Sequence, residues 1–178
     1  DQSDLIKLKK IRHSLYSIED IKFRLVRDIF LSKDKYEEIM FAMMKEKKCD
    51  YKGIISNIYF KKDDIINLDS LGHLVGLHSH NHPTLVENLN YDEQKDEYVK
   101  CQSVISKILN KPANEIKWMS HPCGSYNKDT LAILNELGIK LGFKQYMNID
   151  QEKGMKKINN TNLEIARINH NLILKMMN

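Results

Sequence analysis

Three histidines within five residues are the strongest chemical signal in the sequence. His78, His80 and His82 follow an apolar run at residues 73–77, which is typical of a buried strand. Neutral imidazole is the usual nitrogen donor to zinc, and two imidazoles four residues apart face one ion if the segment makes a helical turn. Pro83 would help to fix where that turn ends. The pattern therefore favours His78 and His82 as two metal ligands over a histidine-rich surface loop.

Two further segments place polar residues after predicted strands. Residues 120–127, Ser-His-Pro-Cys-Gly-Ser-Tyr-Asn, lead into a helix that Asn127 can cap. Taken by themselves, the proline and glycine of this segment predict a turn and nothing more. His170 follows the apolar run at 163–168, and a lone histidine in such a place is more often a hydrogen-bonded surface residue than a catalyst.

Alternating helices and strands are expected to position these groups. Apolar residues at spacings of three and four predict helices, and Asn90 with Glu93 resembles a capping box before one of them. Such alternation predicts parallel βαβ units, in which functional groups lie in the loops after the strands. The predicted helices span 36–43, 63–71 (stopped by Gly72), 92–109 and 127–137 (stopped by Gly138), and the predicted strands span 73–77, 116–120, 139–143 and 163–168.

Composition limits the classes of protein that the chain can belong to. With 178 residues, 42% hydrophobic and 29% charged, it is typical of one soluble globular domain. The formal net charge is +4, but basic residues alternate with acidic ones, so we expect no nucleic-acid partner. We expect no membrane-spanning segment, since no apolar run reaches that length.

Cysteine usage and the first residues give an expectation about location. The three cysteines show no CxxC spacing, which fits a reducing compartment better than an oxidising one. No signal peptide is visible, in a chain that begins at Asp1 rather than Met. These observations favour a cytoplasmic location.

Taken together, the motifs resemble those of the polysaccharide deacetylase family, the chitooligosaccharide deacetylase homology domain of carbohydrate esterase family four. Residues 78–83, His-Ser-His-Asn-His-Pro, are similar to the family's His-Ser/Thr-x-x-His metal motif, and residues 71–77 to the Gly-His-x-x-Gly that precedes it. Residues 121–127 resemble its Pro-Tyr-Gly turn, and residues 137–143 its Leu-Gly-Tyr-x-x-x-Phe segment. The resemblance extends over residues 64–170.

The resemblance implies an α/β fold, a distorted (β/α) barrel with a helical N-terminal region. It implies a single domain at 1–178, in which residues 1–62 form a helical insertion or lid. The implied activity is a hydrolase acting on C–N bonds other than peptide bonds, a zinc-dependent carbohydrate deacetylase. Its substrate would be an N- or O-acetylated sugar or polysaccharide, and Co²⁺, Ni²⁺ or Mn²⁺ are alternative cofactors to Zn²⁺.

Site residues follow from the same resemblance. His78 and His82 would be the metal ligands, with the Ser79 hydroxyl supporting the loop between them. His170 would protonate the leaving amine, and Arg167 would stand in for the family's motif arginine. The turn that lines the substrate groove, and whose backbone N–H helps to stabilise an oxyanion, would consist of Pro122, Cys123 and Gly124.

The chain also departs from the family pattern. The family's strand ending in Asp-Asp, which supplies the general base and the third metal ligand, is not found, because Asp63-Asp64 lies at a predicted helix start. We expect that motif before Asp1, so residues 1–178 by themselves are expected to have little activity. Two alternatives stay open: a non-catalytic metal- or glycan-binding remnant, and an amide hydrolase of a small nucleotide-linked sugar. The sequence does not give the oligomeric state.

Overall fold

The computed structural model describes residues 2–12, 16–145, 161–167, 173–174 and 177. The chain divides into two compact units, Asp1–Tyr59 and Phe60–Asn178. The boundary falls close to the end of the helical region that the sequence predicts. His170 lies outside the described residues, so its expected role as a general acid stays a prediction.

The first unit is helical, and short polar side chains begin most of its helices. Ser17 and Asp20 form a capping box, and Ser32 and Asp50 accept backbone N–H groups at two other helix starts. A π-helical turn at Val26–Phe30 separates two of the helices. The helices are α1 (Gln2–Arg12), α2 (Ile18–Leu25), α3 (Lys33–Glu46) and α4 (Tyr51–Ile58).

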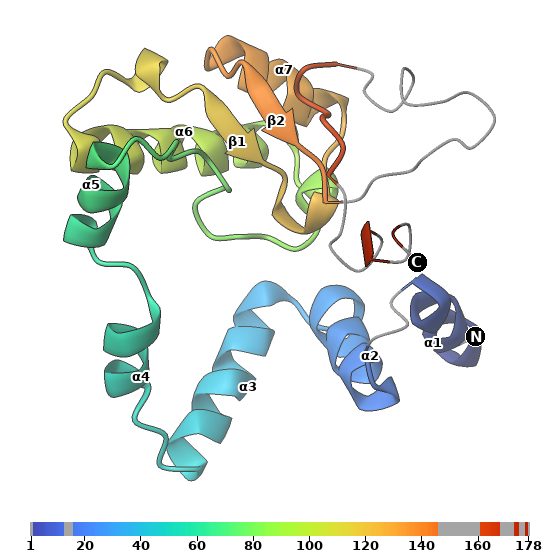
Figure 1. Cartoon of the computed structure of the whole chain (residues 1–178). Coiled ribbons are helices and arrows are strands. Elements are labelled where there is room, and N and C mark those ends of the chain that lie inside the picture. Colours follow the sequence, from blue (N-terminus) through green and yellow to red (C-terminus); the bar gives the residue numbers. More distant parts are fainter. Residues whose placement is uncertain (1, 13–15, 146–160, 168–172, 175–176, 178) are drawn as a thin grey trace. The chain divides into compact units, whose positions relative to one another are not determined.

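The second unit alternates helices with short parallel strands, as the sequence predicts (Figure 1). Asn90 and Asn127 each close a capping box with the residue three positions later. Gly72 and Gly138 end their helices at positive φ, which an L side chain rarely adopts. The elements are α5 (Lys62–Ser70), α6 (Tyr91–Leu109), β1 (Trp118–Ser120), α7 (Lys128–Glu136) and β2 (Leu141–Phe143), with 3₁₀ turns at Val86–Asn88, Ala113–Glu115 and Pro122–Gly124.

The sheet is shorter than the predicted strands, although its direction is as expected. β1 and β2 pair in parallel, Leu77 forms a single parallel bridge to Met119, and Ile165 forms one to Phe143. The four segments thus lie side by side in chain order, each parallel to the next. The predicted α/β class is confirmed, whereas the closed barrel is not seen among the described residues.

Alternation along the strands divides the sheet into two faces. Leu77, Met119 and Gly142 are buried, and the first two pack into the core with α6 and α7. α6 supplies Tyr98, Cys101 and Ile105 to that core, at the spacings of three and four that place residues on one face of a helix. The opposite face carries His78 and Ser120, which are less buried than the residues of the core. Among the described residues, no helix has the length and apolarity needed to cross a membrane.

The core also holds a neutral histidine directly after β1. His121 is 1% exposed, and its Nε2 donates to the Leu163 carbonyl, with 2.8 Å between the two atoms. Burial lowers the pKa of His121, although the Leu163 carbonyl and the Glu164 carboxylate oppose that shift, and the charges of His78 and Lys144 add to it. The folded chain therefore keeps this imidazole neutral at a pH where the unfolded chain protonates it.

This difference predicts that the protein loses stability as the pH falls below about 6.5, the ordinary pKa of histidine. Between the lowered folded pKa and that value the unfolded state binds more protons, so the free energy of unfolding falls by up to about 1.4 kcal/mol per pH unit. Urea unfolding between pH 5 and pH 8 measures this slope. We expect His121→Leu to flatten it and His80→Gln, a change at an exposed histidine, to preserve it. An unchanged slope in His121→Leu would contradict the assignment.

Candidate functional site

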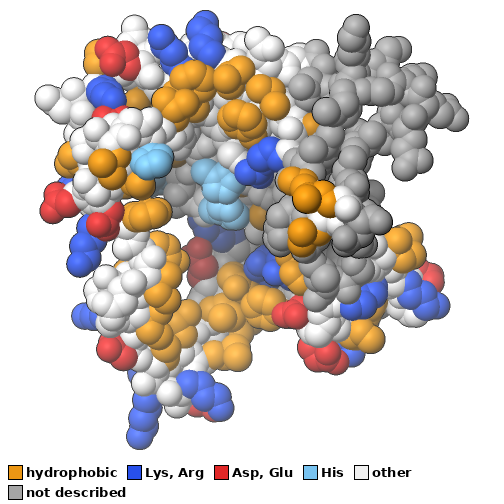
Figure 2. Space-filling model, in the orientation of Figure 1, with side chains coloured by type: hydrophobic (Ala, Val, Ile, Leu, Met, Phe, Trp, Pro, Cys, Tyr) orange, Lys and Arg blue, Asp and Glu red, His pale blue; other side chains and the backbone are white. Residues whose placement is uncertain are grey.

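The two predicted metal ligands lie together at the open face of the sheet. The imidazole rings of His78 and His82 have centroids 4.8 Å apart, with an angle of 63° between the ring planes. Both residues are exposed to solvent. Histidine side chains are visible on the face that Figure 2 shows, with apolar and basic side chains beside them.

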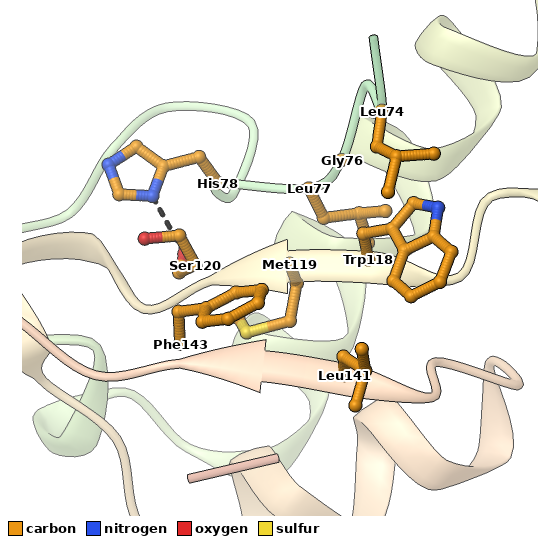
Figure 3. A pocket seen from close by; sticks show the side chains of 9 residues that line it. All are labelled: Leu74, Gly76, Leu77, His78, Trp118, Met119, Ser120, Leu141 and Phe143. Atoms are coloured by element: carbon orange, nitrogen blue, oxygen red, sulfur yellow. Dashed lines mark hydrogen bonds between the residues drawn. The ribbon is translucent and has the colours of Figure 1, made fainter. Parts of the chain in front are cut away.

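The hydrogen bond of His78 selects its tautomer. Its Nδ1 lies 2.7 Å from the Ser120 carbonyl oxygen, and a carbonyl accepts a proton without donating one (Figure 3). Nδ1 therefore carries the hydrogen, and the Nε2 of the neutral ring keeps its lone pair. A carbonyl partner on one ring nitrogen is the usual companion of a metal on the other. The donor set of this residue thus fits a divalent ion.

The electrostatic surroundings favour the neutral form of His78 as well. Partial burial lowers the pKa of its imidazole, and the charges of His82 and Arg167 lower it further, while the hydrogen bond to Ser120 raises it. A metal ligand must be deprotonated, so a lowered pKa extends the pH range in which this ring can bind an ion.

The loop reaches this geometry without the helical turn that the spacing suggested. Ser79 and His82 have φ values of 60° and 53°, in the left-handed region that costs residues other than glycine on the order of 1–3 kcal/mol. The Ser79 hydroxyl accepts the His82 backbone N–H at 3.1 Å, so the predicted supporting serine does bond within the loop. The backbone reversal at these two residues, rather than helical periodicity, brings the rings together.

The sequence did not single out Glu97, which holds the centre of this loop. Its carboxylate accepts the backbone N–H groups of His80 and Asn81 and the side-chain amide of Asn81. The spacing of α6 could have identified it: Glu97 lies four residues before the buried Cys101 and therefore on the same buried face of the helix. A carboxylate on the buried face of a helix needs a partner, because an unpaired buried charge is strongly unfavourable.

The predicted groove turn follows β1 directly. Pro122 is buried, Cys123 is exposed at a φ of 52°, and Gly124 has a φ of 73°. A Cβ on Gly124 would come within 2.9 Å of the Gln145 side chain, so the turn requires glycine there. The Ser125 hydroxyl accepts the Glu87 backbone N–H at 3.1 Å, which fixes the turn to the segment that follows the histidine loop.

Arg167 lies near the same end of the sheet. It follows the bridge at Ile165, and its Nε donates to the Lys144 carbonyl, with 2.7 Å between the two atoms. Its charge contributes to the lowered pKa of His78. The structure thus brings Arg167, the groove turn and the two histidines to the carboxyl ends of adjacent parallel segments.

A small apolar cavity lies on the open face beside His78. Its volume is about 300 Å³, and Figure 3 shows His78 at one end of the row of side chains that line it, with Leu74 and Trp118 at the other. The lining residues come from the segment that ends at His78 and from the two strands β1 and β2. They include Gly76, Ser120, Leu141 and Phe143.

A third metal ligand is not found near the two histidines in the described part of the chain. No group of three or more His, Cys, Asp or Glu side chains there has the arrangement of a metal site. Asp63 and Asp64 lie in the first turn of α5, where Asp64 accepts the Lys61 backbone N–H at 2.7 Å. The expectation that this dipeptide is a helix start and not the family's motif is consistent with these contacts.

The fold of part of the chain is similar to that of solved structures. The chain is 24% identical to the Streptococcus pyogenes deacetylase PplD, solved in complex with acetate, with a TM-score of 0.51; the match covers 65% of this chain and 47% of that one. The chain therefore spans about half the length of that protein.

Two structures of the Bacillus anthracis protein BA3943 are also similar. They are the wild type, described as a CE4 family pseudoenzyme, and a mutant described as having restored enzymatic activity. Each is 23% identical with a TM-score of 0.40, and the matches cover 44% of this chain and 26% and 27% of those chains.

Comparison of sequences identifies the family itself. No curated protein sequence matches the chain. The family model described as polysaccharide deacetylase matches residues 30–142, which include both histidines of the loop and the turn after β1. Since that match covers more than half of the 178 residues, the chain belongs to the polysaccharide deacetylase family.

Proposed function

We propose that His78 and His82 bind the divalent ion of a hydrolase that removes acetyl groups from an N- or O-acetylated sugar or polysaccharide. The observation that carries the proposal is the pairing of the two rings 4.8 Å apart, with Nδ1 of His78 fixed by the Ser120 carbonyl. This arrangement leaves Nε2 of His78 able to bind a cation, and the ring of His82 is close enough to bind the same cation. We take the ion to be Zn²⁺, for which histidine nitrogen is a common ligand, with Co²⁺, Ni²⁺ or Mn²⁺ as alternatives.

When bound, such an ion supplies Lewis acidity toward a carbonyl oxygen and lowers the pKa of a water molecule to about 7. The residues of the chain orient the reactants. The apolar cavity beside His78 suits the methyl group of an acetyl substituent, because removing apolar surface from water is favourable. In the proposed site a backbone N–H of the turn at Cys123 stabilises the oxyanion, a role that does not depend on the side chain at that position.

Two cationic groups are further members of the proposed site. Arg167, whose charge acts on His78, would bind substrate oxygen atoms in place of the family's motif arginine. His170, as an imidazolium, would donate a proton to the leaving amine. The third ligand and the general base are assigned to an Asp-Asp motif before Asp1, because a catalytic zinc site normally has three protein ligands.

We predict that Zn²⁺ binding depends on His78 and His82 and not on His80. Replacing both ligand histidines by alanine should abolish stoichiometric binding, because no nitrogen pair remains to bind the ion. His80→Ala should retain it, since the contact of His80 with Glu97 is made by its backbone N–H. Equilibrium dialysis of chelator-stripped protein followed by metal analysis measures the content. Equal zinc content in wild type and the double variant would contradict the proposal.

We also predict that residues 1–178 by themselves release little acetate, while a longer chain that includes an upstream Asp-Asp motif is active. Removal of a general base typically costs about 100- to 10,000-fold in rate. Acetate release from acetylated chito-oligosaccharides, acetylated peptidoglycan fragments and a nucleotide-linked N-acetyl sugar, each with Zn²⁺ or Co²⁺ supplied, measures the difference. Activity confined to the nucleotide-linked sugar would favour the amide hydrolase alternative. A longer chain that binds zinc but stays inactive on every substrate would favour a non-catalytic binding module.

A further inference from the structure

A buried carboxylate on α6 lies beneath the loop that holds both histidines. Glu97 is 8% exposed, and its Oε2 lies 2.9 Å from the His80 backbone nitrogen and 2.7 Å from that of Asn81. Its Oε1 lies 2.6 Å from Nδ2 of Asn81. One side chain thus accepts three hydrogen bonds from two successive residues, which are two of the three that separate the candidate ligands.

The loop requires such an external partner. Ser79 and His82 both adopt positive φ, and these residues flank the two whose backbone N–H groups point to Glu97. Positive φ in residues other than glycine persists only where surrounding contacts over-determine it. One turn further along α6, the Cys101 thiol also contacts the backbone of His78. The helix therefore supports the loop at two consecutive turns.

We infer that Glu97 is the positioning residue of the histidine pair. It does not contact the ion or the substrate; it fixes the backbone between the two ligands so that both imidazoles face the same point. Charged acceptors make hydrogen bonds roughly twice as strong as neutral ones, which suits a residue that must stabilise an unfavourable backbone conformation. The inference rests on the proposed function in one respect, namely that the two rings face a metal site.

The chain offers two graded variants and a matched control. Glu97→Met keeps the length of the side chain and removes every acceptor. Glu97→Gln keeps one oxygen for the two backbone N–H groups, and its amide can bond to Asn81 if the Asn81 amide turns over. The control is Gln102→Met, because Gln102 is a buried polar residue on the same helix that bonds to the Ala113 and Leu137 carbonyls, away from the loop.

Two measurements on the full chain separate positioning from stability. Zinc affinity is determined by competition with a chromophoric chelator, at a temperature where circular dichroism shows every variant folded. Loss of a partner that orients metal ligands typically lowers metal affinity about 10- to 100-fold. We expect such a loss in Glu97→Met, a smaller one in Glu97→Gln, and no change in Gln102→Met although its melting temperature falls.

The second measurement needs no metal. Nuclear Overhauser contacts between the rings of His78 and His82 in the metal-free protein report their approach, which the structure gives as 4.8 Å between centroids. We expect these contacts to disappear in Glu97→Met and to persist in Gln102→Met. Their persistence in Glu97→Met, with unchanged zinc affinity, would overturn the inference. Absence of zinc binding in wild type, with ring contacts that Glu97→Met abolishes, would overturn the proposed function and leave the positioning role supported.

Discussion

A carboxylate that is removed from water and surrounded by backbone N–H groups is the constraint on which the candidate site depends. Glu97 cannot leave its position without exposing a charge to the core or leaving the N–H groups of His80 and Asn81 unpaired. The loop, in turn, cannot relax to an ordinary backbone conformation without losing those bonds. The unfavourable positive φ values of Ser79 and His82 are therefore balanced by hydrogen bonds to Glu97 on α6, together with the bond from the His82 backbone N–H to the Ser79 hydroxyl inside the loop.

The same loop is held from its other side by the sheet. The Ser120 carbonyl at the end of β1 accepts the ring hydrogen of His78, and the Leu77 backbone bonds to both Trp118 and Ser120. One ligand is thus oriented by the sheet, while the backbone between the ligands is oriented by α6. Because helix and sheet share one packed core, the ring geometry follows from the packing of the whole second unit.

The local features of the sequence predicted the elements well. Capping residues such as Asn90 and Asn127, glycine stops and apolar spacing located α5, α6, α7 and both strands, since these signals act within a few residues of one another. The extent of the strands was less predictable. An apolar run such as 73–77 is compatible with a full strand, but pairing depends on a partner elsewhere in the chain, and within this run only Leu77 forms a β-bridge to another described residue.

The sequence by itself determined the family, the parallel order of the elements and which two histidines lie together. Residue type and spacing suffice for these, because donor chemistry and periodicity are local properties. Tertiary structure decided how the histidines meet. Their approach depends on Glu97, 16 and 17 residues from its backbone partners, and on Ser120, 42 residues from His78. Contacts across such separations form only when helix and sheet pack together, and the periodicity of the sequence does not predict them.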